Sequence, residues 1–149
     1  MLGRMIHTVS GETKLLPYSG RQGEYINSVS RAGLNIALMN EADKYHALDP
    51  EHFPRTSRTY FKINELRAAR AFEAGEKGGR PIKVIYHSHC DAGAYFSAED
   101  AATFARDGAL QWPCAFVVIS VVAGEVVDRK LWVHLPGTDD FREGSFEVR

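Results

Sequence analysis

Residues 82–100 read Ile-Lys-Val-Ile-Tyr-His-Ser-His-Cys-Asp-Ala-Gly-Ala-Tyr-Phe-Ser-Ala-Glu-Asp, and this stretch decides how the chain is interpreted. Residues 82–89 are rich in β-branched and aromatic side chains and follow a Gly-Gly-Arg-Pro break at 78–81, which is typical of a buried strand. Successive side chains of a strand point to opposite faces of the sheet. We therefore expect His87 and His89 to share one face, within reach of a single metal ion.

The end of the same stretch predicts the start of a short helix. Ser97 is a favourable N-cap residue, and Asp100 falls at the third helical position, where its carboxylate faces back toward the loop of residues 90–96. We expect the helix opened by these residues to run on from Ala101 to Asp107. Serine and an acidic residue at this spacing also form an ordinary capping box, which alone would account for both of them.

The two histidines and the aspartate form a candidate metal site. Two imidazoles and one carboxylate are a ligand set that Zn²⁺ favours when a fourth position is left for water. A single buried histidine is more often a hydrogen-bonded core residue, but two histidines on one apolar face would be costly to bury without partners. We therefore predict that His87, His89 and Asp100 hold Zn²⁺, while Ser97 caps the helix and still touches the site.

The spacing H-x-H, seven residues, S-x-x-D over residues 87–100 resembles the motif of the JAMM (MPN-plus) zinc metalloprotease family. The segment that precedes the motif in bacterial members of the family also resembles this chain, at residues 40–50, 53–54 and 60–64. The resemblance therefore covers about residues 24–135. It implies an α/β (α+β) fold with an MPN/JAMM-like mixed β-sheet flanked by helices, which is cytidine-deaminase-like. In that family the two histidines and the aspartate bind zinc, the serine helps hold the tetrahedral intermediate, and an upstream glutamate is the general acid/base.

The glutamate has two candidates in this chain. The chemistry needs a carboxylate that takes a proton from the attacking water and gives it to the leaving amine. Glu24 opens an alternating segment that predicts a strand over residues 24–31, paired as a hairpin with Leu34–Met39, and this hairpin matches the place of the family's glutamate. However, bulkier residues follow Glu24 than is usual in the family. Glu12 is the main rival, and Glu41 lies in the wrong part of the pattern.

Cys90 is a second departure, because the family usually has proline after the second histidine. A small apolar loop residue is the simpler interpretation. A thiol next to a metal ligand can also compete for zinc or be oxidised. Both interpretations stay open at this point.

Length and composition limit the remaining possibilities. A chain of 149 residues fits one domain, which we take as residues 1–149. A net charge of −1 gives no indication of the excess positive charge that binds nucleic acid or an anionic membrane. Two cysteines make no disulfide framework, and no signal peptide or transmembrane run is evident, so we expect a cytoplasmic protein.

The other breaks in the sequence predict the remaining elements. Residues 1–23 show little beyond a short helix and loop, and residues 41–59 form a polar connection that in the resembled family borders the substrate groove. Asn64 caps a helix over Glu65–Lys77, followed after the metal-site segment by strands over Ala115–Val122, Glu125–Leu135 and Phe141–Val148. The residues expected to pack are Ile63, Leu66, Ala69 and Phe72 at the helix, and Val126, Leu131 and Trp132 after Gly124.

The resemblance implies zinc-dependent hydrolysis of a peptide or isopeptide bond after the C-terminal tail of a ubiquitin-like or sulfur-carrier protein. It also implies E1/E2-like proteins of the same operon as partners. Two alternatives stay open: a catalytically inactive MPN scaffold, and a JAMM peptidase that acts on cell-wall or phage peptides. An amidohydrolase barrel would also begin with H-x-H, but such a barrel has roughly 250 residues, far more than this chain.

Overall fold

The computed structural model of this protein describes residues 3–7, 13–17, 25–30, 35–79 and 81–146. Its main sheet has six strands in the order β10-β9-β8-β5-β3-β4. The bounds of these strands are β3 Tyr25–Ser30, β4 Asn35–Met39, β5 Ile82–Cys90, β8 Ala115–Val122, β9 Glu125–His134 and β10 Phe141–Gly144. The central strands β5 and β8 are parallel and the other neighbours are antiparallel, so the sheet is mixed, as predicted.

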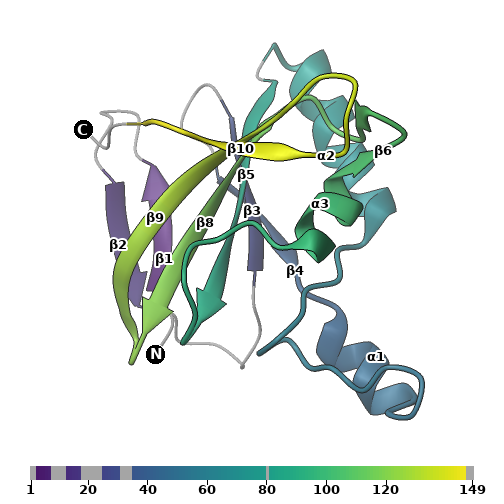
Figure 1. The fold of residues 1–149 in the computed structure, drawn as a ribbon, viewed down its shortest axis with the longest axis vertical. Helices are drawn as coiled ribbons and strands as arrows, with labels where there is room; N and C mark the ends of the chain where they lie inside the picture. Colours follow the sequence, from purple (N-terminus) through teal and green to yellow (C-terminus); the bar gives the residue numbers. More distant parts are fainter. Residues whose placement is uncertain (1–2, 8–12, 18–24, 31–34, 80, 147–149) are drawn as a thin grey trace.

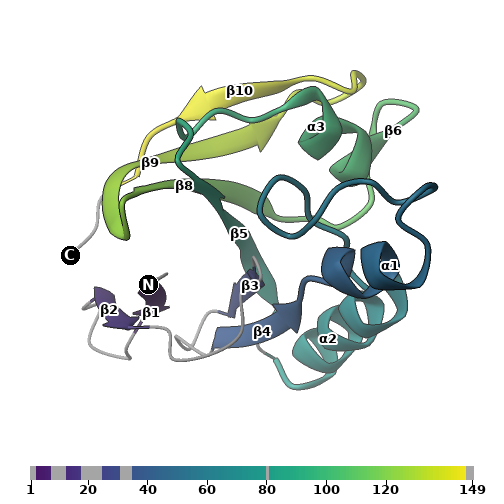
Figure 2. The same ribbon diagram turned by 90° about the horizontal axis from the view of Figure 1, so that it is seen from below.

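Three helices lie to one side of the sheet: α1 Ala42–Leu48, α2 Glu65–Lys77 and α3 Ala98–Phe104. In Figures 1 and 2 they lie to the right of the central strands, while the N-terminal strands lie to the left. The predicted α/β architecture with a sheet flanked by helices is therefore confirmed. None of the helices in the described part of the chain is long and apolar enough to cross a membrane.

The N-terminal segments form strands where the sequence had suggested a short helix. β1 Gly3–His7 pairs antiparallel with β2 Thr13–Pro17, in a two-stranded sheet of their own. The predicted hairpin of β3 and β4 is confirmed, with Asn27 opposite Ala37 in the ladder. Cross-strand pairing is a non-local interaction, so the weak local pattern of residues 1–23 could not reveal the first pair.

The two faces of β5 belong to different clusters of the core. Ile85 is buried with Phe104 and Phe116 on the side of the helices. Tyr86, the next residue, is buried with Val117, Ile119 and Val121 on the opposite side. His87 follows Ile85 in the alternation, and its ring lies 4.8 Å from that of Phe61 in the first cluster. The metal-site histidines therefore project from the centre of the sheet toward the helices.

The helix α2 matches its predicted bounds, and Asn64 accepts a hydrogen bond from the backbone N–H of Arg67 as its N-cap. The predicted buried face is only partly right. Ala68 and Phe72 are buried, whereas Leu66 is 60% exposed and Ala69 is also exposed. The helix lies at one end of the sheet, near β4 and β5 (Figure 2), so only a narrow stripe of its surface is covered.

Residues 41–59 were predicted as a polar connection, and the structure corrects this by placing α1 within it. The side chain of Asn40 starts the helix, since its Oδ1 accepts from the N–H of Ala42 at 3.0 Å. Asp43 then accepts from both the backbone N–H and the hydroxyl of Ser57, at 2.8 and 2.6 Å. These contacts join the helix to the far end of the connection and hold the whole segment in one shape.

The C-terminal strands agree with the sequence, but α3 ends earlier than predicted. β8 has its predicted bounds, β9 ends one residue early at His134, and β10 ends at Gly144 within the described residues. After α3 the chain forms a small hairpin of β6 Ala105–Arg106 and β7 Ala109–Leu110. Asp107 and Gly108 have positive φ angles of 54° and 77°, which an α-helix excludes, so the helix cannot reach Asp107.

Candidate metal centre

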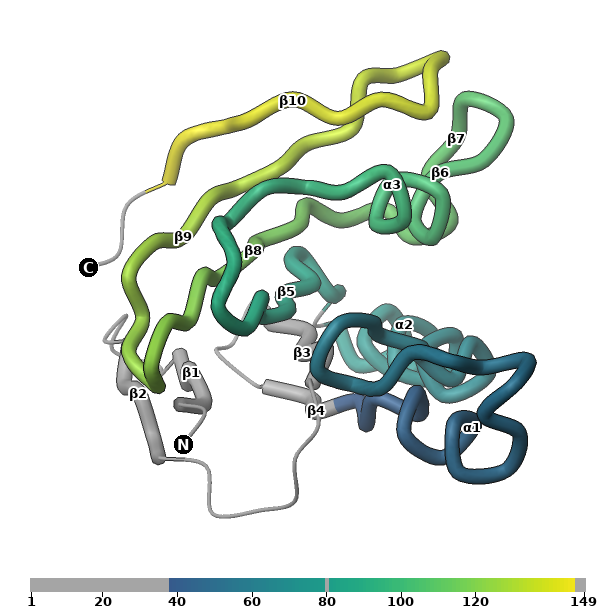
Figure 3. The backbone as a smooth tube through the Cα atoms, turned by 60° about the horizontal axis from the view of Figure 1, so that its bottom comes forward, coloured from purple at the N-terminus to yellow at the C-terminus, as the bar shows by residue number. Residues whose placement is uncertain are grey.

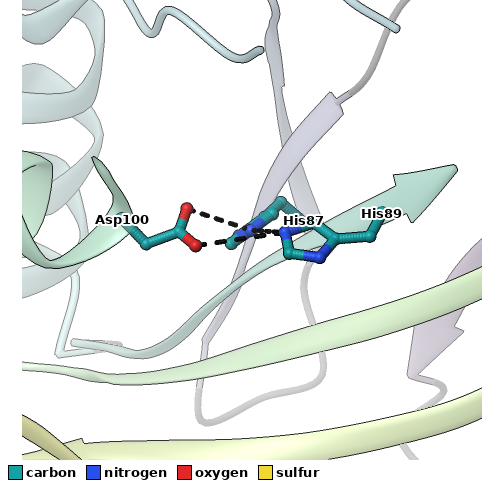
Figure 4. A group of neighbouring side chains, drawn as sticks. All are labelled: His87, His89 and Asp100. Carbon is teal, nitrogen blue, oxygen red and sulfur yellow. Dashed lines mark hydrogen bonds and ion pairs between the residues drawn. The ribbon is translucent and has the colours of Figure 1, made fainter. Parts of the chain in front are cut away.

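Three side chains meet where the end of β5 passes the start of α3 (Figure 4). The Nε2 atoms of His87 and His89 lie 3.2 Å apart, and Nε2 of His87 lies 3.3 Å from Oδ1 of Asp100. Nε2 of His89 lies 3.9 Å from Oδ2 of Asp100. One ligand atom from each residue can be chosen so that all lie within 4.8 Å of one another, so this group could hold a metal ion.

The distances fit a tetrahedral ion. Zinc binds imidazole nitrogen at about 2.0–2.1 Å and carboxylate oxygen at about 2.0–2.2 Å, so neighbouring ligand atoms of a zinc tetrahedron lie about 3.3–3.5 Å apart. The two shorter distances, 3.2 and 3.3 Å, are close to this edge length. The side chains therefore need little movement to bind an ion, and only three of its four positions would be filled by the protein.

The ring of His89 is oriented by a backbone carbonyl. Its Nδ1–H donates to the carbonyl oxygen of Gly93 at 2.8 Å, which leaves the lone pair of Nε2 directed at the other two ligands. Burial lowers the pKa of His89, and the neighbouring His87 lowers it further. The ring is therefore a neutral ligand at neutral pH.

The loop that carries Gly93 is itself fixed from the sheet. The hydroxyl of Ser120 on β8 donates to the carbonyl of Ala92 at 2.6 Å, and the indole N–H of Trp132 on β9 donates to that of Ala94 at 3.2 Å. Both donors belong to the same sheet as β5, since β8 is the neighbour of β5 and β9 is the neighbour of β8. The sheet thus positions both the histidine and the carbonyl that orients it.

His87 is the most deeply buried member of the group. Its side chain is 1% exposed, against 2% for Asp100 and 15% for His89. Its Nδ1 atom has no hydrogen-bond partner within the part of the chain that the structure describes. Nε2 is therefore the ring nitrogen that faces the other two ligands.

Asp100 turns one carboxylate oxygen toward Ser97 and the other toward His87. Its Oδ2 accepts from both the backbone N–H and the hydroxyl of Ser97, each at 2.7 Å, and its own N–H donates to the Ser97 hydroxyl oxygen. This is the capping box expected from the sequence. Burial alone would raise the pKa of Asp100, but the hydrogen bonds and charge of His87 and the hydrogen bonds of Ser97 outweigh it, and the net shift is downward. The Oδ1 atom remains for a metal ion.

A cleft of about 300 Å³ opens onto the group and is lined by His89, Ser97 and Asp100. Its opposite wall comes from the segment between α1 and α2, which arches toward α3 in Figures 2 and 3. Two arginines of that segment line the cleft, Arg55 bonded to Glu99 and Arg58 bonded to Asp91 at 2.9 Å. The cleft is therefore open, polar near the ligands and bordered by fixed charges.

The two cysteines occupy different surroundings. Cys90 is the last residue of β5, half-buried, and it lines the cleft beside His89. Burial raises the pKa of Cys114 to about 12 despite a hydrogen bond from the backbone of Ile85. Cys114 packs against the aromatic cluster away from the ligands, as a small apolar residue would.

Glu24 and Glu12, the two candidates for the general base, both fall outside the described residues, so their assignments stay predictions. Glu41 accepts long hydrogen bonds from the Asn64 amide and caps no helix with its side chain. Sequence reasoning did not find Gly93, whose carbonyl carries no sequence signal, nor Tyr95, whose ring meets the edge of His89 at 4.9 Å.

The comparison with protein families agrees with the motif. The family model described as prokaryotic homologs of the JAB domain matches residues 19–134. A solution structure of a protein from Salinibacter ruber has 22% sequence identity and a TM-score of 0.46, over 86% of this chain and 77% of that one.

Short segments also match curated kynurenine 3-monooxygenases. The protein from Anopheles gambiae is 47% identical over 45 residues, and the one from Xanthomonas campestris pv. campestris (strain B100) is 44% identical over 59 residues. These segments cover 30% and 40% of this chain. The chain spans only 9% and 12% of those relatives, so the matches carry no argument about its chemistry.

Proposed function

The chain belongs to the prokaryotic homologues of the JAB domain, and we propose that it is a zinc-dependent metallopeptidase that hydrolyses a peptide or isopeptide bond. The observation that carries this proposal is that ligand atoms of His87, His89 and Asp100 lie within 4.8 Å of one another, and that the spacings of His87 to the other two are close to the edge of a zinc tetrahedron. His89 and Asp100 also line an open cleft, so a substrate in the cleft would lie beside the ion.

Zinc is the proposed ion because two imidazoles, one carboxylate and an open position are a ligand set of catalytic zinc sites. When bound, zinc would lower the pKa of a water molecule to about 7 and polarise the carbonyl of the scissile bond. The protein residues hold the ion and orient one another: Gly93 orients His89, and Ser97 orients Asp100. All three metal ligands come from β5 and α3.

Glu24 is the proposed general acid/base, because it precedes the hairpin of β3 and β4, where the resembled family carries its glutamate. Glu12 remains its rival. In the proposal the Glu24 carboxylate takes a proton on attack and passes it to the leaving amine.

Ser97 is proposed to stabilise the negative charge that develops on the substrate oxygen. Its hydroxyl currently donates to Asp100, so a hydrogen bond to the substrate requires the hydroxyl to rotate. Ser97 lines the cleft, which supports access to the substrate. The helix start keeps a second hydrogen bond to Asp100 through the Ser97 backbone N–H, so the carboxylate stays in place when the hydroxyl turns.

The proposed substrate is the C-terminal tail of a ubiquitin-like or sulfur-carrier protein, joined to a lysine or to a small molecule. An open cleft suits an extended chain of this kind. E1/E2-like proteins of the same operon are the proposed partners, and the cytoplasm is the proposed location. Genes that neighbour this one would distinguish conjugation from sulfur transfer.

The test uses zinc content and turnover together. The purified chain should bind one zinc ion, and His89→Ala should lose it, whereas His52→Ala, whose side chain is 78% exposed, should keep it. Glu24→Gln should keep zinc and lower turnover of a tail-fusion substrate by roughly 10²- to 10⁴-fold. Unchanged turnover in Glu24→Gln would move the role to Glu12. A chain that stays metal-free when zinc is supplied would instead be an inactive scaffold.

A further inference from the structure

A second pocket adjoins the cleft of the metal centre and is not explained by the metal chemistry. It has a volume of about 220 Å³ and shares three lining residues, Arg55, Tyr60 and Glu99, with that cleft. Its other walls include Tyr45 of α1 and Phe53 with Pro54 from the segment that follows. The two hollows are therefore neighbours, with these residues between them.

The size of the pocket limits what it can hold. Binding sites for small molecules usually measure about 300–1,000 Å³. At about 220 Å³ this pocket is too small for an independent ligand of that kind, but it has room for one side chain. Because it continues into the cleft, that side chain can belong to a chain whose other residues lie beside the metal ligands.

The walls of the pocket are held in place without a ligand. The N–H of Phe53 donates to the carbonyl of Asp49 at 2.9 Å, and the carbonyl of Phe53 accepts from Nδ1 of His46 at 2.7 Å. The rings of Tyr45 and Phe53 lie 5.2 Å apart. A preformed wall binds with a smaller loss of conformational entropy than a mobile one, so the pocket is suited to recognition.

The segment that builds the pocket adds little to the core. Leu48 at the end of α1 is 73% exposed, and Phe53 is 39% exposed. Its hydrogen bonds, such as that of the Ser57 hydroxyl to Asp43, hold its shape instead. The Phe53 ring is therefore available to a ligand that enters the pocket.

The charges of the pocket exclude a basic occupant. Lys62 lines it with its Nζ 5.3 Å from the centre of the Tyr45 ring, and Arg55 borders it with its guanidinium 4.9 Å from that of Tyr60. Glu99 is its only acidic lining residue among those described, and it is already bonded to Arg55. A lysine or arginine side chain would meet uncompensated positive charge, whereas an apolar side chain would meet three aromatic rings and a proline.

We propose that this pocket, lined by Tyr45, Phe53, Pro54 and Tyr60, is a substrate subsite for a bulky apolar side chain. The side chain belongs to an extended peptide whose scissile bond lies at the metal centre, and phenylalanine and leucine are the residues of suitable chemistry. This inference rests on the proposed peptidase function, and it adds a sequence requirement a few residues from the bond that is cleaved.

The first test measures binding and needs no catalysis. Amide resonances of the zinc-supplied protein are followed by NMR during titration with the capped amino acids N-acetyl-phenylalanine, -leucine, -alanine and -lysine methylamide. The phenylalanine and leucine compounds should shift the signals of residues 45 and 53, and the alanine and lysine compounds should not. Equal shifts with alanine or lysine, or shifts confined to other regions, would overturn the proposal.

Two matched variants make this test specific. Phe53→Ala should weaken binding of the phenylalanine compound about tenfold, the loss expected when roughly 1.4 kcal/mol of apolar contact is removed. Leu48→Ala removes an exposed apolar side chain from the same segment outside the pocket and should leave binding unchanged. Phe53→Leu keeps an apolar wall and should recover most of the affinity. Equal weakening in Phe53→Ala and Leu48→Ala would contradict the subsite.

The second test places the subsite relative to the scissile bond. Quenched fluorescent peptides carry phenylalanine, alanine or lysine at each position on either side of the bond. One position should favour phenylalanine over alanine about tenfold in kcat/KM, and Phe53→Ala should remove that preference while Leu48→Ala keeps it. Cleavage of every peptide without such a position would overturn the subsite alone. Failure to cleave any peptide, with the phenylalanine compound still bound, would overturn the peptidase instead.

Discussion

His89 and Asp100 are prepared for a metal ion by their protonation states. A ligand must be deprotonated to bind, so metal affinity depends on pH. The pKa of His89 is lowered by burial and by His87, and the pKa of Asp100 is lowered on balance despite its burial. Neither group therefore takes up a proton until the pH falls below its ordinary value.

We predict that protonation of these two ligands lowers the zinc affinity only slightly between pH 8 and the ordinary histidine pKa of about 6.5. The affinity can be measured by competition with a chromophoric chelator. Affinity should fall steeply only at lower pH. The sign follows from the depressed pKa values, since the deprotonated forms persist to more acidic solution. A midpoint of zinc loss above pH 6.5 would show that the ligand set is not protected in this way.

The buried thiol of Cys114 predicts a loss of folding stability at alkaline pH. Its pKa is raised by burial from 9.0 to about 12, so the folded protein keeps the neutral thiol while the unfolded chain ionises above pH 9. The stability contributed by the neutral thiol is complete below pH 9 and is lost as the pH rises toward 12. At pH 10.5 the loss amounts to about 1–2 kcal/mol of unfolding free energy.

Urea denaturation of the wild type and of Cys114→Ala at pH 8 and pH 10.5 isolates this contribution. The variant has no thiol to ionise, so its free energy of unfolding should fall less than that of the wild type, by about 1–2 kcal/mol. Parallel losses in the two proteins would mean that the thiol does not remain neutral in the fold.

The start of α3 serves the helix and the metal centre with the same two residues. Ser97 and Asp100 satisfy each other's hydrogen bonds in a capping box, and Asp100 keeps one oxygen for the ion. Ser97→Ala should lower the free energy of unfolding by about 1 kcal/mol, the usual loss for an N-cap. Ser97→Thr retains the hydroxyl and should stay close to the wild type. The free energy of unfolding of both variants is measured without zinc, so that the effect of the cap is not confused with an effect on catalysis. A Ser97→Ala protein as stable as the wild type would contradict the capping role.

Elements with strong local signals could be predicted from the sequence. The bounds of α2 followed from Asn64 as an N-cap, and those of β8 from an apolar run that only Ser120 interrupts. The helix α1 was missed because its shape depends on contacts distant in sequence, such as that of Asp43 with Ser57. Leu66 was assigned to the buried face because periodicity shows which residues share a stripe, not how much of the stripe a sheet will cover.

Some features of the candidate site could also be predicted from the sequence, and others could not. The spacing of His87, His89 and Asp100 predicted a shared location, because strand alternation and a capped helix start are local rules. The carbonyl of Gly93 and the pocket around Phe53 could not be predicted, since backbone acceptors carry no sequence signature and a pocket needs several segments at once. Glu24 lies outside the described residues and stays a prediction from the sequence pattern.

The metal centre joins the middle of the sheet to a helix on its surface, so loading it should stabilise the whole fold. His87 and Asp100 are 1% and 2% exposed and come from β5 and α3. A ligand present at about 100 times its Kd adds about 2.7 kcal/mol to the unfolding free energy if the unfolded chain does not bind it. For a domain of this length that corresponds to a rise in Tm of roughly 5–10 °C.

Calorimetry with zinc and with a chelator would measure this rise, and His89→Ala should abolish it. His52→Ala, changed at an exposed side chain far from the ligands in sequence, should show the full rise. Magnesium offers a further comparison, because it prefers six oxygen ligands and should give little stabilisation to a site of two nitrogens and one oxygen. An equal rise in the wild type and in His89→Ala would place the bound ion elsewhere, and the stabilisation would then say nothing about the junction of β5 and α3.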